Sequence, residues 1–294
     1  MASLKDIRSR IDSTRNTQQI TKAMKLVSAA KLRRAQNAIT NMRPYAQSLL
    51  RVIANIAVTE RVSHPLLSPP PEVKKVLLVV LSSDRGLCGG FNSQINRFVE
   101  QYLRQNGPKY EAIDTFFIGR RAMDFFGRRG VRPIESMIKL DKEISLGLAS
   151  AMAEKLVRRY LAGEYQEIRV VYNEFKSAIS QVVNCETLLP IDLSKQTLSG
   201  ALEGGLPAFS QDMIFEPAPE IMIEDLLVKH FSIQMYRYMA ESVASEHGAR
   251  MSAMESASNN AKEVLSRLTL TYNKIRQEKI TTELIEIVSG AEAL

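Results

Sequence analysis

The chain of 294 residues contains no tryptophan, two cysteines and three histidines. Cys88 and Cys185 are too far apart for a redox motif or a zinc-ligand spacing, so we expect a reducing compartment. No window approaches ~20 consecutive apolar residues, which excludes a membrane-spanning helix of the usual kind. The N-terminus lacks the apolar core of a signal peptide, and its helical pattern begins too early to leave room for a removable transit peptide.

Glycine is absent from residues 1–60, and that stretch contains one proline, Pro44. After Pro219 there is no further proline, and the only glycines are Gly248 and Gly290. Because both regions are rich in good helix formers, we predict one very long helix at each end of the chain. Residues 61–219 hold ten of the eleven prolines and twelve of the fourteen glycines, which indicates a globular domain between the two helices.

The C-terminal region carries an apolar or small residue at alternating steps of three and four. The positions are Ile223, Leu226, His230, Ile233, Arg237, Ala240, Ala244, His247, Met251, Met254, Ser258, Ala261, Leu265, Leu268, Tyr272 and Ile275. A repeat that averages 3.5 residues is the seam of a left-handed coiled coil. We expect the two histidines on it to be partly buried seam residues and not ligands.

The N-terminal helix is the expected partner, because one apolar stripe in water is not stable alone. Ser3 and Asp6 have the spacing of a helix-capping box. The apolar positions expected to recur on this helix are Leu4, Ile7, Ile11, Ile20, Met24 and Val27. We therefore predict a long antiparallel coiled coil of the two ends of the chain. The alternative is two ordinary helices packed on a globular core.

The middle of the chain alternates between strand and helix patterns. Short apolar runs such as KKVLLVVLSS are followed by amphipathic segments such as FNSQINRFVEQYLRQNG, which favours a mostly parallel, doubly wound sheet. The fold class is therefore α/β, with a Rossmann-like domain inserted between the coiled-coil helices. The predicted boundaries are 1–60 for the N-terminal helix, 61–73 for a stiff, extended proline-rich linker, 74–216 for the α/β domain and 217–294 for the C-terminal helix. Within the domain, the glycine-rich segment 197–209 is expected to be a mobile loop.

The motif SSDRGLCGGFN, residues 82–92, is the one candidate for a phosphate site or a nucleophile. Its glycines fit neither dinucleotide-binding nor P-loop spacing, and no histidine is near Cys88 in sequence. A tight strand-to-helix turn is the favoured interpretation, and an enzyme that uses the turn as a phosphate site is an alternative. We identify no catalytic constellation, metal site or cofactor.

Positive charge is concentrated in the first 60 residues, where eleven Lys and Arg face three Asp and Glu. One use would be nucleic-acid binding by a basic coiled-coil scaffold. We favour a solvated face that complements acidic partners, because no aromatic residues are interleaved with the cations to stack on bases.

The last fifteen residues, ITTELIEIVSGAEAL, continue the helix beyond the reach of the N-terminal helix. They spread apolar side chains around a single helix, and exposed apolar surface of this kind usually marks a binding site.

Three motifs, spread over the whole chain, resemble those of one family. ITTELIEIVSGAEAL, SSDRGLCGGFN and the opening NTQQITKAMKLVSAAKLRRAQ are similar to the gamma subunits of bacterial F-type ATP synthases. The resemblance implies a non-catalytic rotor shaft that couples proton flow through the membrane to ATP synthesis or hydrolysis.

The implied partners are the alpha and beta subunits of the catalytic head, the epsilon subunit and the c-ring, with no nucleic acid. The implied location is the cytoplasmic side of the cell inner membrane, as a peripheral part of the complex. The resemblance also implies partner-binding residues, which are Lys22, Met24, Arg276, Gln277, Thr281, Glu283, Leu284, Ile287 and Val288.

Overall fold

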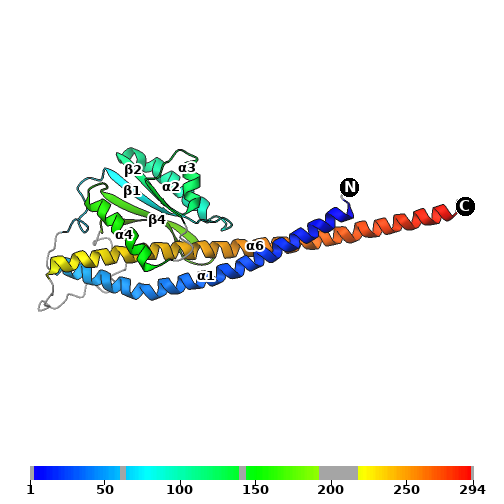
Figure 1. Cartoon of the computed structure of the whole chain (residues 1–294), viewed down its shortest axis with the longest axis horizontal. Coiled ribbons are helices and arrows are strands. Elements are labelled where there is room, and N and C mark those ends of the chain that lie inside the picture. Colours follow the sequence, from blue (N-terminus) through cyan, green and yellow to red (C-terminus); the bar gives the residue numbers. More distant parts are fainter. Residues whose placement is uncertain (1–2, 60–63, 139–143, 192–217, 293–294) are drawn as a thin grey trace. The chain divides into compact units, whose positions relative to one another are not determined.

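The computed structural model describes residues 3–59, 64–138, 144–191 and 218–292 (Figure 1). The chain divides into two compact units, Met1–Ala29 with Arg250–Leu294, and Ala30–Ala249. The expected glycine-rich loop 197–209 lies outside the described residues. Within the described ranges, no helix is both long and apolar enough to cross a membrane.

Two very long helices begin and end the described chain, as the scarcity of helix breakers predicts. Helix α1 spans Leu4–Thr59 and helix α6 spans Pro219–Glu292. The predicted capping box forms at the start of α1. The Ser3 backbone N–H donates to Asp6 Oδ2 at 3.1 Å, and the Asp6 N–H donates to Ser3 Oγ at 3.3 Å. Two of the first N–H groups of the helix are thereby satisfied.

Five strands form the sheet of the larger unit, in the order β3-β2-β1-β4-β5. Their bounds are β1 Lys75–Leu81, β2 Ala112–Ile118, β3 Glu135–Met137, β4 Glu167–Phe175 and β5 Gln181–Leu189. The first four strands are parallel to their neighbours, and β5 pairs antiparallel with β4. Strand β1 lies at the centre, where residues 76–81 are fully buried, as expected for an apolar run covered on both faces.

Helices cover both faces of the sheet. On one face lie α2, Phe91–Asn106, and α3, Arg120–Gly127; a 3-10 turn, η1, follows α2 over Gly107–Lys109. On the other face lie α4, Leu146–Leu161, and the parts of α1 and α6 that belong to this unit. Leu49 and Ile53 of α1 and Leu227 and Phe231 of α6 share this second core with the sheet. The predicted mostly parallel, doubly wound domain is confirmed.

The proline-rich linker is not extended throughout, contrary to the sequence-based expectation. Its described part, from His64 on, starts with a turn in which the Leu67 N–H donates to the His64 carbonyl at 2.9 Å. Leu66 is buried in the core at this turn. The reason is that an apolar side chain between prolines gains more from burial than from continuing an extended segment in water.

Among the glycines that the structure describes, Gly119, which follows β2, has the closest backbone neighbour. Its φ is +102°, and a Cβ atom built there would lie 2.1 Å from the Ser82 carbonyl oxygen. Only a residue without a side chain fits this conformation and this approach.

We predict that Gly119→Ala lowers the free energy of unfolding by at least ~3 kcal/mol, since strain at positive φ adds to a backbone clash. The control is Gly127→Ala, which replaces a glycine of α3 that has open space around it. Helix propensity favours this control change by up to ~1 kcal/mol. Urea unfolding of both variants measures the difference, and equal stability of the two would contradict the argument.

Candidate functional site

The seven sequence-predicted seam positions from Met254 to Ile275 form a continuous inward-facing stripe on α6. Met254 and Ala261 are buried, while Ser258, Leu265, Leu268, Tyr272 and Ile275 are half-buried. In this unit α6 lies beside the first part of α1 and runs in the opposite direction (Figure 1). The antiparallel coiled coil predicted from the 3.5-residue repeat is confirmed for this unit. In the larger unit the predicted seam positions Ile223 and Ile233 pack instead in the core that α6 shares with the sheet.

The matching stripe on α1 differs from the prediction in its middle. Leu4, Ile7 and Ile11 face inward as expected, but Ile20 and Val27 are 59% and 58% exposed. Small polar residues occupy the seam at this level instead, with Thr21 and Ser28 buried. The physical reason is geometric, because steps of three and four from Leu4 lead to Thr21 and Ser28, and small side chains let two helix backbones approach closely.

An inter-helix ion pair marks the register, with Lys25 Nζ 2.7 Å from Glu255 Oε1. In an antiparallel pair this contact places Leu4 level with Arg276, since each lies twenty-one residues away along its own helix. The pairing therefore stops where Ile275 ends the seam. From Arg276 onward, every described side chain of α6 is exposed.

The free C-terminal segment of α6 carries five exposed large aliphatic side chains on little more than two turns. They are Ile280, Leu284, Ile285, Ile287 and Val288, and Ile287 reaches 68% exposure. Within α6, Lys279 pairs with Glu283 at 3.6 Å and Lys274 pairs with Glu278 at 3.9 Å. Apolar surface that a helix leaves uncovered in this way is typical of a docking segment.

The predicted partner-binding residues lie on these two helices of the smaller unit. Lys22 is exposed and Met24 half-buried, one turn or less from the Lys25–Glu255 pair. Arg276 and Gln277 begin the free segment, and Thr281, Glu283, Leu284, Ile287 and Val288 follow on it, all exposed. Arg276 forms no ion pair with any residue that the structure describes. Lys22 and Met24 thus lie on the paired part of α1 and the other seven residues on the free segment of α6, so the structure does not bring the two groups together.

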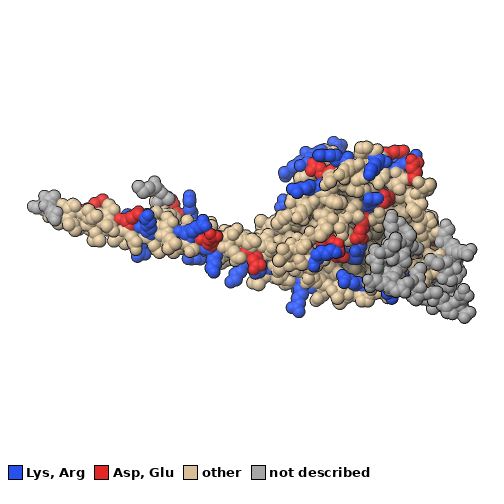
Figure 2. All heavy atoms as spheres, turned by 180° about the vertical axis from the view of Figure 1, so that it is seen from behind, with Lys and Arg blue, Asp and Glu red and all other residues tan. Residues whose placement is uncertain are grey.

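Basic and acidic side chains alternate along the paired helices on the face shown in Figure 2. Positive charge does not gather there into one continuous surface, so this face supports the interpretation of the basic residues as a solvated face. Among the described residues, no three His, Cys, Asp or Glu side chains are grouped as a metal site.

The SSDRGLCGGFN motif forms a turn whose polar groups bond to one another. The Ser83 N–H and hydroxyl both donate to Asn92 Oδ1, at 3.1 and 3.0 Å, and Asn92 Nδ2 donates to Cys88 Sγ at 3.2 Å. Cys88 is buried. The turn joins β1 directly to α2, as the favoured interpretation predicts.

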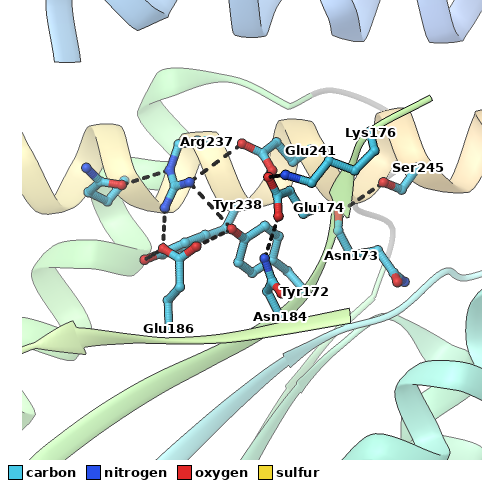
Figure 3. Close-up of polar contacts among 11 residues, drawn as sticks. Tyr172, Asn173, Glu174, Lys176, Asn184, Glu186, Arg237, Tyr238, Glu241 and Ser245 are labelled. Carbon is cyan, nitrogen blue, oxygen red and sulfur yellow. Dashed lines mark hydrogen bonds and ion pairs between the residues drawn. The ribbon is translucent and has the colours of Figure 1, made fainter. Parts of the chain in front are cut away.

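A second polar cluster, which sequence reasoning missed, joins α6 to β4 and β5 in the larger unit (Figure 3). The Arg237 guanidinium forms an ion pair with Glu186, donates to Gln234 Oε1 at 2.9 Å and lies 3.6 Å from Glu241. The Tyr238 hydroxyl donates to the same Glu186 at 3.1 Å, and the Tyr172 hydroxyl also donates to it.

Burial governs the ionisation of this cluster. Burial raises the pKa of Glu241 and of Tyr238. For Arg237, burial alone would lower the pKa, but the surrounding tyrosines and carboxylates raise it, so the guanidinium stays charged. Because the charge is paired and hydrogen-bonded, the cluster ties α6 to the sheet without leaving an uncompensated ion.

His230 lies two turns before Arg237. Both His230 and His247 are buried, not partly buried as expected. Burial first, and Arg237 second, lower the pKa of His230 to about 4. Its Nδ1 atom has no hydrogen-bond partner among the described residues. The ring is therefore neutral near pH 7, and a proton would be costly there.

Comparisons with known proteins agree on one family. The family model described as ATP synthase matches residues 3–294. The ATP synthase gamma chain of Bdellovibrio bacteriovorus is 65% identical over 294 residues, covering 100% of this chain and 99% of its own length. That of Anaeromyxobacter dehalogenans is 47% identical over 298 residues, with both chains fully covered. The chain therefore belongs to the gamma-chain family of ATP synthase.

Two solved structures show the same fold. The central stalk and c-ring structure of Tetrahymena thermophila mitochondrial ATP synthase matches with a TM-score of 0.60 and 28% identity, covering 81% of this chain and 99% of that one. The mitochondrial ATP synthase of Euglena gracilis matches with a TM-score of 0.68 and 20% identity, covering 99% and 94%. Because the Euglena gracilis structure is only 20% identical, its likeness to this chain concerns the fold alone.

We predict that acid weakens the fold partly through His230. Its pKa is about 4 in the fold and about 6.5 when unfolded. Below pH 6.5 the imidazole of His230 binds a proton in the unfolded chain but not in the folded chain. The free energy of unfolding therefore falls with pH until the pH reaches the pKa of His230 in the folded chain. Between pH 7 and pH 5 this amounts to about 2 kcal/mol. His230→Leu should reduce the pH-dependent loss by about that amount in urea unfolding of the isolated chain, and an unchanged loss would contradict the prediction.

Proposed function

We propose that this chain is the central rotor subunit of a bacterial F-type ATP synthase. In this role it transmits rotation between the membrane c-ring and the beta subunits, so that proton flow drives ATP synthesis and ATP hydrolysis drives proton pumping. The observation that carries the proposal is the coiled coil whose longer helix continues alone as an exposed apolar segment. The membership of the gamma-chain family supports the same role.

The chain itself would catalyse nothing, and its work would be mechanical. It would lie on the cytoplasmic side of the cell inner membrane as a peripheral part of the complex. We assign residues 1–60 and 217–294 to the shaft, residues 74–216 to the α/β domain that contacts the epsilon subunit and the c-ring, and residues 61–73 to the linker. The similar Tetrahymena thermophila structure comprises a central stalk together with a c-ring, which supports a c-ring as partner.

The free segment would turn within the ring of alpha and beta subunits. Its aliphatic side chains suit this task because dispersion contacts are weak one by one and have no preferred direction. Two ion pairs along α6, Lys274–Glu278 and Lys279–Glu283, neutralise part of the charge that could hold the segment at one angle. Arg276, Gln277 and Thr281 would make the polar contacts to the beta subunits at the base of the segment. Lys22 and Met24 would make contacts from the paired part of α1, close to Lys25.

The test of this function is purification of the tagged chain from its host in mild detergent. Alpha, beta and c-type subunits should accompany it, and the isolated chain should lack ATP hydrolysis. Recovery of the chain alone or with nucleic acid would reject the proposal.

We predict that Met24→Lys lowers ATP-driven proton pumping relative to ATP hydrolysis in the assembled enzyme. The new cation would pair with acidic groups of a beta subunit and retain the shaft at one angle. The control Ala23→Lys adds the same charge one residue earlier, at an exposed position. Pumping and hydrolysis are measured on the same membrane vesicles. An unchanged ratio for Met24→Lys, or an equal fall in both variants, would count against a specific contact.

We also predict that the shaft tolerates loss of its end better than a break in its seam. Deletion of residues 290–294 should leave assembly and most coupled activity, because it removes only part of the unpaired helix. Leu265→Pro should abolish assembly, because proline interrupts the helix where Leu265 packs in the seam.

The matched control for this pair is Lys279→Pro, which places the same break beyond the seam. It should retain assembly and lose part of the coupling. Co-purification of the chain with the alpha and beta subunits measures the outcome, and equal loss of assembly with Leu265→Pro and with the deletion would refute the ranking.

A further inference from the structure

Gly248 lies inside helix α6, two residues before Arg250, where the part of the helix that belongs to the smaller unit begins. A glycine in the interior of a helix is destabilising relative to alanine, so its presence calls for a local reason. A Cβ atom built at Gly248 would lie 3.2 Å from Cε2 of Phe175 and 3.3 Å from the Cα atom of Ala178. Phe175 ends β4, and Ala178 lies in the turn of residues 176–180 that joins β4 to β5. The backbone of this turn therefore packs against the helix at a position that has no side chain.

The turn of residues 176–180 is held in shape by its own hydrogen bonds. The Ser177 N–H donates to the Ser180 carbonyl at 3.0 Å, and the Ser180 N–H donates to Ser177 Oγ at 3.0 Å. Gln181 Nε2 donates to the Ala178 carbonyl at 3.0 Å. Because such a network makes a segment more rigid, the turn can resist a helix that presses on it.

Gly248 belongs to a row of contacts between α6 and the β4–β5 hairpin. Arg237 and Gly248 are eleven residues apart, which is about three full turns, so they lie on the same face of the helix. Arg237 pairs with Glu186 of β5, and Ser245 Oγ donates to the Asn173 carbonyl of β4 at 3.0 Å (Figure 3). Helix α6 thus follows the hairpin from Glu186 to the turn, where Gly248 lies.

The contact at Gly248 determines the angle of α6 about its own axis. Successive residues are rotated by about 100° around an α-helix. Rotation of α6 in either direction would bring the side chain of His247 or of Ala249 to the place of Gly248, against the backbone of Ala178. Apolar packing alone has little directional preference, so it resists such a rotation less.

We propose that the turn of residues 176–180 is a contact through which the α/β domain transmits torque to α6, and that Gly248 is the positioning residue of this contact. The inference rests on the proposed function, in which torque enters the α/β domain from the c-ring and the shaft carries it to the beta subunits. Torque then has to pass from the sheet to α6 within the larger unit, and Gly248 lies at the border of that unit.

The first experiment compares Gly248→Leu with Lys229→Leu in the assembled enzyme. Leucine is a better helix former than glycine, so the change does not weaken the helix itself. A leucine side chain at position 248 would displace the turn, whereas Lys229 is exposed. Gly248→Leu should lower the ratio of ATP-driven proton pumping to ATP hydrolysis several-fold in membrane vesicles, and Lys229→Leu should leave it unchanged. An unchanged ratio for Gly248→Leu, or an equal fall in both variants, overturns the inference.

A shortened hairpin removes the same contact from the other side. Replacement of residues 176–180 by Asn-Gly, which favours a two-residue turn, removes Ala178 and keeps both strands. This change should lower the same ratio, and Gly248→Leu in the shortened chain should lower it no further, because the two changes remove one contact. Falls that add would show that the turn and Gly248 act separately, which contradicts the proposal.

The matched control within the turn is Ile179→Ser. The Ile179 side chain is 87% exposed, so its replacement leaves the contact of Ala178 with α6 in place. The ratio of pumping to hydrolysis should stay unchanged. A fall as large as that of the shortened hairpin would assign the turn to binding of another subunit and overturn the inference.

Hydrogen exchange of the full chain tests the contact without measuring coupling. With the shortened hairpin, amides of residues 245–249 should exchange at least about tenfold faster than in the unaltered chain, while those of α4 change little. Unaltered exchange overturns the inference and leaves the rotor function intact. Failure of the tagged chain to purify with ATP synthase subunits would overturn both.

Discussion

An apolar stripe on a helix cannot remain in water, and this constraint governs the smaller unit. Helix α6 repeats its inward positions at an average of 3.5 residues up to Ile275, and α1 supplies the opposing stripe from Leu4 onward. Where the stripes are matched, small residues such as Thr21 and Ala261 are buried between the backbones. Where α1 begins, the match ends, and the aliphatic side chains that follow on α6 are exposed in this chain.

In the larger unit, two kinds of contact hold the long helix α6 against the sheet. Apolar packing of Leu227 and Phe231 supplies the area, but such packing has little directional preference. The pairing of Arg237 with Glu186 adds direction, and the tyrosine hydroxyls satisfy the remaining lone pairs of the carboxylate. Breaking one member would leave a buried charge, which costs far more than the intact cluster contributes.

Spacing predicted more of this structure than residue chemistry did. The α6 stripe followed from the period alone, and the strands followed from short apolar runs that only a sheet buried on both faces can accommodate. The assignment of Ile20 and Val27 to the seam was wrong because it followed hydrophobicity, whereas the steps from Leu4 lead to Thr21 and Ser28. Arg237 stood on the predicted stripe, but its partners on the sheet, Glu186 and Tyr172, lie 51 and 65 residues away, and no local pattern reveals them. The partner-binding residues remain predictions, since surface contacts leave no signature in a single chain.

The end of the seam has a mechanical consequence. Two packed helices resist torsion more than one, so a torque applied along the smaller unit does not distribute evenly. The segment from Arg276 to Glu292, roughly 25 Å of single helix, therefore twists more than the paired part under the same torque. The residue at which α1 begins therefore determines the length of the single-helix segment of α6.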